Sequence, residues 1–375
     1  MAPTDFSSLR GVRVLDFTRL LPGPYGSLLL SGLGAEVIKV ETPTQNDYTR
    51  QIGPELFATV NRYKKAILVD YRKPEGREVM LRMAEQAQVV FEGFRPGAMA
   101  AWGLGYEDFR QRNASIVYCS LSGYGQEGAY RDRAGHDLNY MAVSGLLGLM
   151  GEIRHHGAAP NPEFPIGDVT SGMMAALAIC AAVAGAARTG QGGYLDVAIL
   201  DPVFSIAVAL NGARPTGRSP QFDLLNMPMY NVYETADGQY FTLGNVEPHF
   251  LRNFCAAVER PDLADRGADP ETGLILAELM RTRTRAEWSA LFEEIDTCWA
   301  PVHTPVEALY DPHLRDRGLV VDGQSGPEFA VALPFAKPAE DRPAPALGQD
   351  TLAVLAEFGL SQAEIDALLA AGIIG

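Results

Sequence analysis

Residues 9–41 read LRGVRVLDFTRLLPGPYGSLLLSGLGAEVIKVE and decide the fold of the first part of the chain. Two β-rich runs, residues 12–17 and 36–41, flank a stretch typical of a helix, residues 26–33. This order predicts two parallel strands joined by a right-handed helical crossover. The turn before the helix reads RLLPGPYG rather than G-x-G-x-x-G, so it does not indicate a nicotinamide dinucleotide site.

The same alternation of strands and helices continues to about residue 200. Further strands are expected at residues 66–70, 89–94, 116–121 and 194–200, and further helices at residues 75–88, 98–102 and 168–188. The pattern predicts an α/β fold with a Rossmann-like parallel sheet in a large domain. Such sheets serve many activities, so the function has to be argued from particular residues.

A smaller α+β domain is expected after the large one. Asp237-Gly238 lies between two β-rich runs, residues 229–235 and 239–243, which is a strong signal for a β-hairpin. We assign residues 1–200 together with 330–375 to the large domain, residues 201–224 to a linker and residues 225–329 to the small domain.

Charge and hydrophobicity exclude some classes of partner. The net charge of −15 over 375 residues argues against nucleic acid, whose phosphates need clustered positive charge. The first 100 residues hold 13 Lys and Arg against 11 Asp and Glu, a net of +2, which leaves −17 for the rest. A small anionic ligand therefore finds its most favourable surface in the first third.

We expect neither a membrane span nor a secretory leader. The most apolar stretch, residues 172–187, is rich in Ala and Met and follows Asp168 closely, as in a buried helix of a soluble protein. The four cysteines lack paired or metal-type spacing: Cys119, Cys180, Cys255 and Cys298. A reduced, cytoplasmic protein is the simplest interpretation.

Three short segments contain residues with catalytic chemistry. They are AGHDLNY at residues 134–140, PIGDVTSG at 165–172 and GNVEPHF at 244–250. Each also has a structural interpretation, because Asp168 suits a helix N-cap, His136 with Asp137 suits a cap pair, and Glu247 suits a helix start. None of the three segments is specific by itself.

A longer set of motifs changes this balance. In order they are LRGVRVLDF (residues 9–17), GPYG (23–26), LGAEVIKVE (33–41), EGFRPG (92–97), SGYGQEG (122–128), GDVTSG (167–172) and RTGQGGYLDV (188–197). With these motifs the chain resembles, nearly end to end, the class III CoA-transferase superfamily, which also contains the α-methylacyl-CoA racemases. The resemblance puts Asp168 at the position of the catalytic carboxylate.

Two activities follow from the resemblance. In the racemase branch, which is similar at residues 134–140, 247–250 and 296–302, His136 and Asp168 are the acid–base pair at the α-carbon of a 2-methylacyl-CoA. Glu247 would orient the imidazole, and Tyr230 would support Asp168. The backbone N–H groups of the helix after Asp168 would stabilise the enolate.

In the transferase branch Asp168 is instead a nucleophile that forms an aspartyl-CoA intermediate between two carboxylic acids. That branch typically has Gln where this chain has Leu21, so we favour the racemase. A third reading is an inactive acyl-CoA-binding protein, against which the presence of His136, Asp168 and Glu247 together argues.

The resemblance also implies how CoA is held. The expected contacts are Val69, Tyr71, Arg72 and the loop of Gly93, Phe94 and Arg95. Relatives often have Arg at the positions of Thr42 and Ala101, so the phosphate contacts are expected to be rearranged, with Lys39, Arg50 or Lys64 as substitutes. CoA enters as part of the substrate, with no tightly bound cofactor and no metal, and the resemblance implies an interlocked homodimer.

Overall fold

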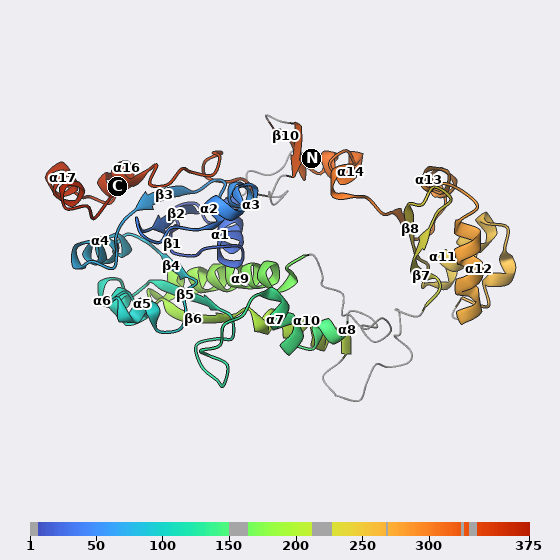
Figure 1. The fold of residues 1–375 in the computed structure, drawn as a ribbon, viewed down its shortest axis with the longest axis horizontal. Helices are drawn as coiled ribbons and strands as arrows, with labels where there is room; N and C mark the ends of the chain where they lie inside the picture. Colours follow the sequence, from blue (N-terminus) through green and yellow to red (C-terminus); the bar gives the residue numbers. More distant parts are fainter. Residues whose placement is uncertain (1–6, 150–163, 212–226, 268, 324–325, 330–335) are drawn as a thin grey trace. The chain divides into compact units, whose positions relative to one another are not determined.

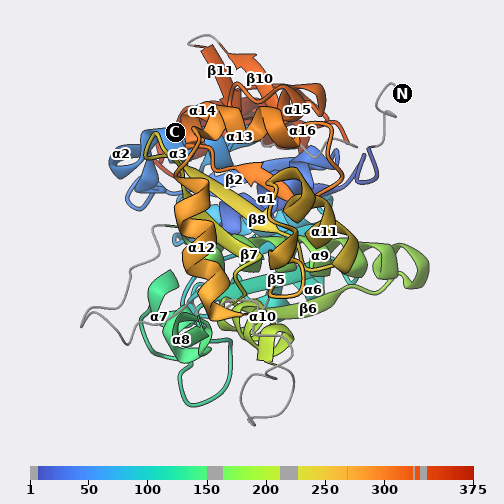
Figure 2. The ribbon, with the colours of Figure 1, turned by 90° about the vertical axis from the view of Figure 1, so that its right-hand side faces the viewer.

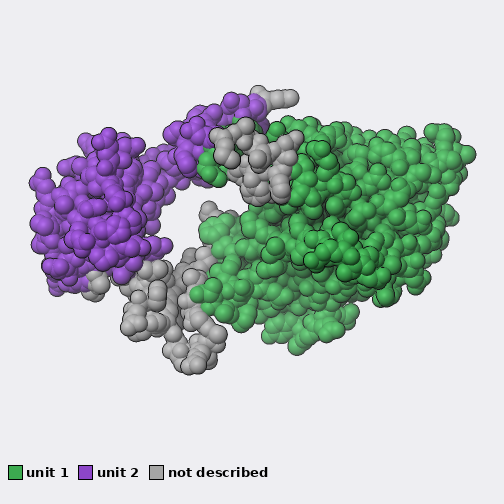
Figure 3. Space-filling model, turned by 180° about the vertical axis from the view of Figure 1, so that it is seen from behind, with its two compact units in different colours: residues 1–210, 317–321, 329–375 green, residues 211–316, 322–328 purple. Residues whose placement is uncertain are grey.

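The computed structural model describes residues 7–149, 164–211, 227–267, 269–323, 326–329 and 336–375. The chain divides into two compact units, each of which is described by itself (Figure 3). Unit 1 comprises Met1–Leu210, Arg317–Val321 and Phe329–Gly375, and unit 2 comprises Asn211–Asp316 and Asp322–Glu328.

Unit 1 is built on a parallel six-stranded sheet in the order β3-β2-β1-β4-β5-β6 (Figure 1). Its strands are β1 (Arg13–Asp16), β2 (Glu36–Glu41), β3 (Lys65–Leu68), β4 (Val89–Glu92), β5 (Val117–Ser122) and β6 (Gly193–Ala198). This is the Rossmann order, in which the chain leaves β1 toward one edge and returns through β4 toward the other. The predicted α/β fold class is confirmed.

Alternating side chains of the strands build two cores, one on each face of the sheet. Leu15 of β1 packs with Val79 of α4 (Pro74–Ala84) and Val354 of α16 (Thr351–Glu357). Its neighbour Val14 packs on the opposite face with α1 (Pro22–Gly32) and α9 (Ile166–Thr189). The other helices of unit 1 are α2 (Thr49–Ile52), α3 (Pro54–Val60), α5 (Ala98–Ala101), α6 (Tyr106–Arg112), α7 (Asp137–Val143), α8 (Leu146–Leu149), α10 (Leu200–Asn211) and α17 (Gln362–Ala370).

Helices α1 and α9 approach each other closely through two glycines. A Cβ added at Gly172 would lie 2.5 Å from the carbonyl oxygen of Pro22, and one at Gly26 would lie 2.8 Å from the carbonyl oxygen of Gly172. The contact therefore fixes α9, which carries Asp168 in its first turn, against the helix that follows β1.

We expect Gly172→Ala to lower the free energy of unfolding of unit 1 by about 1–3 kcal/mol, because the new methyl group overlaps backbone atoms that cannot rotate away. Denaturant titration followed by circular dichroism measures this. Gly185→Ala is the matched control, since it lies in the same helix with no heavy atom within 4 Å of the added Cβ. The control is expected to gain up to about 1 kcal/mol, and equal effects of both substitutions would contradict the packing argument.

The C-terminal segment covers the edge of the sheet at β3. The amide of Ala66 donates to Asp350, the amide of Leu68 donates to the hydroxyl of Thr351, and Val69 forms an antiparallel bridge with Ile374. These contacts pair the backbone of an edge strand that would otherwise expose its N–H and C=O groups.

The end of the predicted large domain needs a correction. Residues 201–211 were expected to be part of a linker, but they form α10, in which Val203 and Ala207 are buried. Val203 and Ala207 pack with Met141 of α7 and Leu146 of α8, and the three helices lie together in Figures 1 and 2. Residues 212–224 of that linker lie outside the described residues.

Within the described residues, one helix is long and apolar enough to cross a membrane by length and composition, namely α9. A helix in the core of a soluble protein passes the same test. One face of α9 packs on α1 and on β5 and β6, while Met173 and Leu177 are exposed.

Unit 2 contains the predicted hairpin. Strands β7 (Tyr230–Glu234) and β8 (Tyr240–Gly244) pair antiparallel around Asp237-Gly238, and β9 (Trp299–Pro301) pairs with β8. Gly238 has φ +69°, the left-handed conformation that such a turn requires. The remaining helices are α11 (Pro248–Ala257), the 3-10 helix Pro261–Leu263, α12 (Pro270–Met280), α13 (Arg285–Phe292), α14 (Pro305–Ala308) and α15 (Pro312–Asp316). The two-stranded sheet of β10 (Val320–Gly323) and β11 (Gly326–Phe329) contains residues assigned to both units.

Candidate active site

A cavity of about 320 Å³ opens at the carboxyl ends of β1, β4 and β5, where the chain reverses its direction across the sheet. Open parallel sheets bind their ligands at this point. The lining comes from the turn after β1 (Thr18, Arg19, Leu20, Pro22, Gly23), the loop after β4 (Gly93, Phe94, Arg95, Pro96), the end of β5 (Leu121, Ser122, Gly123), the segment before α7 (Arg131, Arg133, Ala134, Gly135, His136), and Tyr140, Asp168 and Ile199. His136 and Asp168 therefore line the same cavity.

His136 occupies the N-cap position of α7, as its structural interpretation predicted. The cap is formed by the backbone, since the amide of His136 donates to the side-chain oxygen of Asn139 at 3.0 Å. The imidazole is exposed and makes no hydrogen bond among the described residues. Capping and chemistry therefore use different atoms of the same residue.

Asp168 does not cap its helix, contrary to the sequence-based expectation. The N-cap of α9 is Pro165, and Asp168 is the third residue of the helix. The capping acceptor is Asp137, whose Oδ1 accepts from the backbone amide of Asp168 at 3.0 Å. Gly167 makes this contact possible, because a Cβ there would lie 2.8 Å from the same oxygen. The carboxylate of Asp168 is thus released from capping and lines the cavity.

The predicted use of backbone N–H groups for the enolate is not supported at this helix end. The amide of Asp168 donates to Asp137, and the amide of Val169 donates to the carbonyl of Pro165 at 3.1 Å. Groups already bound within the protein are not free to stabilise charge on a ligand.

Burial, followed by the nearby charge of Asp137, raises the pKa of Asp168 to about 7. Removing a carboxylate from water disfavours its ionised form, and a second carboxylate adds repulsion. Near neutral pH the group is therefore present both as acid and as base, which is what a general acid–base residue requires.

This pKa predicts how stability depends on pH. The folded chain keeps the Asp168 proton up to about pH 7, whereas an unfolded aspartate releases it at about 3.9. The folded state therefore binds more protons within that window, and the free energy of unfolding falls as pH rises through it. We expect Asp168→Asn to raise the melting temperature at pH 8 by about 3 °C or more, with little change at pH 4.

Differential scanning fluorimetry at both pH values measures the effect. Asp366→Asn is the matched control, because Asp366 is exposed on α17 and its hydrogen bond to Gln362 can be kept by the amide. If Asp168→Asn raised the melting temperature equally at the two pH values, the result would contradict the raised pKa of Asp168.

Tyr140 supports the segment that carries His136, a role that the sequence did not reveal. Its hydroxyl donates to the carbonyl of Gly135 at 2.7 Å, and its ring packs where a Cβ at Gly123 or Gly135 would collide with it. Burial, followed by the charge of Asp168, raises the pKa of Tyr140 to about 12, so the hydroxyl stays protonated and continues to donate.

Glu247 and Tyr230 belong to unit 2, whereas the residues that line the cavity belong to unit 1. Within unit 2 they lie at one end of the small sheet. Tyr230 begins β7 opposite Gly244 at the end of β8, and Glu247 follows as the N-cap of α11. Both are exposed, and their roles beside His136 and Asp168 stay predictions.

The residues expected to hold CoA meet around two aromatic rings. Phe94 and Trp102 are in edge contact at 5.1 Å between centroids, and the guanidinium of Arg72 lies over the Trp102 ring at 4.8 Å. Gly93 and Arg95 are exposed on the cavity side of the same loop. These five residues therefore form one surface.

Val69 and Tyr71 correct part of this expectation. The side chain of Val69 is fully buried in the core, and Tyr71 is packed between Phe17 and Trp102 with 2% exposure. Burial raises the pKa of Tyr71 to about 12. Their side chains shape the core beneath the loop. The backbone amide of Val69 donates to the carbonyl of Glu41, and its carbonyl accepts from the amide of Tyr71.

Glu92 holds the loop of Gly93, Phe94 and Arg95 in place, a role that the sequence did not reveal either. Its carboxylate accepts from the amide of Phe94 at 2.7 Å and from the hydroxyl of Ser120. Burial raises the pKa of Glu92 to about 7.

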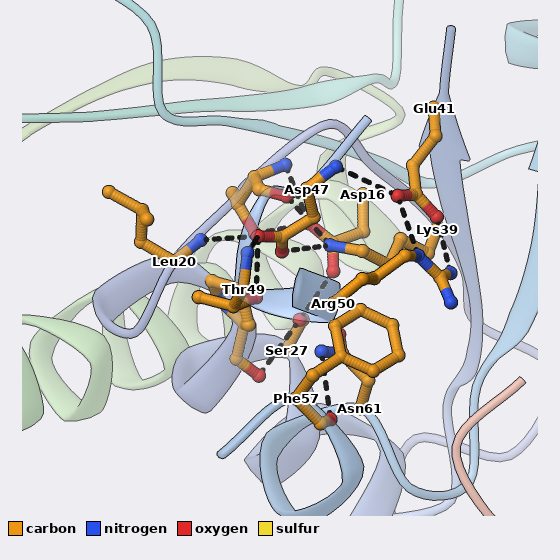
Figure 4. A network of polar contacts seen from close by, with 12 residues as sticks. Asp16, Leu20, Ser27, Lys39, Glu41, Asp47, Thr49, Arg50, Phe57 and Asn61 are labelled. Atoms are coloured by element: carbon orange, nitrogen blue, oxygen red, sulfur yellow. Dashed lines mark hydrogen bonds and ion pairs between the residues drawn. The ribbon is translucent and has the colours of Figure 1, made fainter. Parts of the chain in front are cut away.

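The cations proposed to replace the missing phosphate contacts are structural. Lys39 and Lys64 are fully buried, Lys39 paired with Asp47 at 3.0 Å and Lys64 with Asp16 at 3.4 Å. Arg50 binds Glu41 with two nitrogens, as Figure 4 shows. Burial lowers the pKa of Lys64 to about 8. None of the three is available to a phosphate. The arginines that do line the cavity are Arg19, Arg95, Arg131 and Arg133.

Comparison with known proteins gives a consistent picture. The pattern of CoA-transferase family III matches residues 9–351. The chain is 32% identical to the alpha-methylacyl-CoA racemase of Mus musculus, over 95% of each protein, and 32% identical to the succinyl-CoA:glutarate CoA-transferase of Homo sapiens, over 99% of this chain and 90% of the human protein. A crystal structure of a CAIB/BAIF family protein from Brucella suis superposes with a TM-score of 0.79 at 28% identity, covering 94% of this chain and 99% of that one.

Proposed function

Because this chain belongs to CoA-transferase family III, we propose that its cavity binds an acyl-CoA thioester and moves the proton on the carbon beside the thioester carbonyl. Family membership confirms the resemblance inferred from the motifs. Relatives of both predicted kinds, racemase and CoA-transferase, support an enzyme of this class. The finer assignment, an epimerase of 2-methylacyl-CoA thioesters, is our proposal.

One observation carries the proposal: His136 and Asp168, 32 positions apart, line a single cavity. Inversion at a carbon requires one group that takes a proton from one face and another that returns a proton to the opposite face. Had the two residues lain in separate cavities, this chemistry would be excluded.

The protonation behaviour of Asp168 suits the exchange. Its raised pKa of about 7 leaves both the protonated and the ionised form present near neutral pH. Asp168 can therefore start as the base for one stereoisomer and as the acid for the other, with His136 in the opposite role. The base takes the α-proton, the electron pair moves onto the thioester as an enolate, and the other group protonates the carbon.

Unit 2 and a second copy of the chain complete the proposal. Glu247 would orient the imidazole of His136, and Tyr230 would support Asp168, in an interlocked homodimer as the family resemblance implies. The enzyme would act in the cytoplasm, in keeping with its four free cysteines. It would need no tightly bound cofactor and no membrane.

A CoA-transferase is the second proposed function, favoured by the succinyl-CoA:glutarate relative. In that reaction the carboxylate of Asp168 attacks the thioester carbonyl and CoA leaves as the thiolate. The thiolate then attacks the aspartyl carbonyl of the anhydride, which expels the first acid as its carboxylate and leaves an aspartyl-CoA thioester. The second acid runs the two steps in reverse, so that it receives CoA and the carboxylate of Asp168 is regenerated. The imidazole of His136 has no task in this sequence of steps.

An isotope experiment separates the two functions. Wild-type protein is mixed with a 2-methylacyl-CoA in deuterated water, with and without the carbon-labelled free acid. Deuterium at C2 without any acid supports proton transfer. Carbon label entering the CoA ester, without deuterium at C2, overturns it in favour of the transferase. The absence of both signals would reject both functions and leave an inactive binding protein.

A further inference from the structure

We infer that Arg19 binds the phosphate groups of CoA and that the buried Lys39–Asp47 ion pair is the positioning device that presents it. This inference rests on the proposed function, since it assumes that the cavity receives a CoA thioester. Arg19 lines the cavity in the turn after β1.

Three arginines gather on one small surface. The guanidinium of Arg19 lies over the ring of Phe94 at 4.8 Å, that of Arg72 lies over Trp102 at 4.8 Å, and Arg95 follows Phe94 in the chain. Because Phe94 and Trp102 are in contact, Arg19 and Arg72 lie over one pair of rings, and Arg95 lines the cavity together with Arg19. None of the three arginines has a carboxylate partner among the described residues. Like charges held together without a counterion favour a polyanionic ligand, and a guanidinium group can bind phosphate with two parallel hydrogen bonds.

The backbone around Arg19 is held at both of its peptide groups. The ammonium of Lys39 donates to the carbonyl of Thr18 at 2.9 Å, and Oδ1 of Asp47 accepts from the amide of Leu20 at 3.3 Å. Lys39 and Asp47 bind each other at 3.0 Å, and both side chains are 0% exposed. Figure 4 shows Asp47 between Leu20, Thr49 and Lys39. The ion pair thus clamps the turn immediately before and after Arg19.

The turn also has an unusual backbone conformation. Leu20 has φ +69°, in the left-handed region that side chains other than glycine rarely adopt. Such strain persists only where neighbouring groups fix the backbone, and it occurs preferentially at functional sites. Asp16 adds a third constraint, because its carboxylate accepts from the amide of Thr18 at 2.9 Å.

A buried ion pair is an inefficient way to stabilise a core, since apolar side chains of similar volume do as well or better. A pair that contacts the two peptide groups flanking a cavity arginine is explained better by positioning than by stability. The motif around Lys39 did not reveal this role, because a lysine side chain is rarely fully buried unless it is paired.

Calorimetric titration with CoA and with pantetheine, which lacks every phosphate, tests the role of Arg19. We expect Arg19→Gln to raise the Kd for CoA by roughly 10- to 100-fold and to leave the Kd for pantetheine unchanged. Arg110→Gln, which removes an exposed arginine on α6, is the matched control and is expected to change neither. An unchanged Kd for CoA, or equal losses for both ligands, would overturn the assignment.

A double-mutant cycle tests the ion pair. Lys39→Met/Asp47→Leu removes both backbone contacts without leaving an unpaired buried charge. It is expected to weaken CoA binding in the wild-type background and to add little in the Arg19→Gln background, because both changes act through the same guanidinium. Equal losses in both backgrounds, or a parallel loss of pantetheine affinity, would show a general structural role and overturn the positioning claim.

Should that variant fail to fold, Lys39→Met/Asp47→Asn keeps an acceptor for the amide of Leu20 and removes only the bond to Thr18. The same pattern of CoA affinity losses in the two backgrounds is then expected, with smaller changes in Kd. Failure of the inference remains distinct from failure of the proposed function. Wild-type protein that binds no CoA refutes the function, whereas wild-type protein that binds CoA as tightly as Arg19→Gln refutes the inference alone.

Discussion

Asp168→Asn is expected to lose turnover by roughly 10²- to 10⁴-fold while CoA still binds. The amide fills nearly the same volume at the start of α9 but neither takes nor gives the proton. The backbone amide of residue 168 keeps its bond to Asp137, so the helix end and the cavity should persist. Loss of optical rotation of a single 2-methylacyl-CoA stereoisomer measures turnover, and calorimetric titration measures the binding of CoA.

The matched control for this prediction is Asp132→Asn, an exposed carboxylate near the same cavity that forms an ion pair with Arg131 at 3.7 Å. It is expected to stay within about twofold of wild type, because exposed ion pairs contribute little. Near-normal turnover of Asp168→Asn would remove this carboxylate from the chemistry under either proposed function.

His136→Gln is expected to lose epimerisation by roughly 10²- to 10⁴-fold. The backbone amide that binds Asn139 is retained, so α7 should still start at the same residue. Unlike the aspartate variant, this one separates the two functions, because a CoA-transferase that works through Asp168 would keep most of its rate. The measurement is loss of optical rotation of a single 2-methylacyl-CoA stereoisomer.

Gln at position 136 also tests stability separately from chemistry. The imidazole is exposed and makes no hydrogen bond among the described residues, so the melting temperature should change little. A variant that is as stable as wild type and epimerises at the wild-type rate would end the two-base mechanism.

Regular patterns explain why the sheet could be predicted from the sequence. Strands β1, β2, β4 and β5 consist of short β-rich runs, and helices of suitable length separate or follow them, so the crossover rule gives the parallel order. The hairpin of unit 2 followed from Asp237-Gly238 alone. By contrast, α10 was missed although Pro202 lies in its first turn, where proline is tolerated in a helix.

The sequence predicted the site residues that belong to motifs, but not the tertiary contacts that hold those residues in place. His136 and Asp168 were identified by motif, but the capping of α9 by Asp137, 31 residues upstream, is a tertiary contact that no local pattern contains. The burial of Lys39 and Lys64 likewise depends on partners that only the fold supplies. Asp47 and Asn61 are examples, because neither belongs to any motif.

The side chains of Val69 and Tyr71 show the converse error. Both directly follow β3, where CoA contacts were expected, but Val69 points into the core, and the aromatic rings of Phe17 and Trp102 enclose Tyr71. Whether these side chains are exposed depends on the packing around them, which sequence order does not reveal.

One measurement tests most directly whether an imidazole and a carboxyl group act on opposite faces of one carbon. Each pure stereoisomer of a 2-methylacyl-CoA is incubated in deuterated water with His136→Gln and with Asp168→Asn, and hydrogen exchange at C2 is followed by mass spectrometry. The account predicts that His136→Gln exchanges the C2 hydrogen of only one stereoisomer and that Asp168→Asn exchanges that of only the other. Neither variant is expected to invert the configuration at C2. Exchange of both stereoisomers by either variant, or of the same one by both, would contradict it.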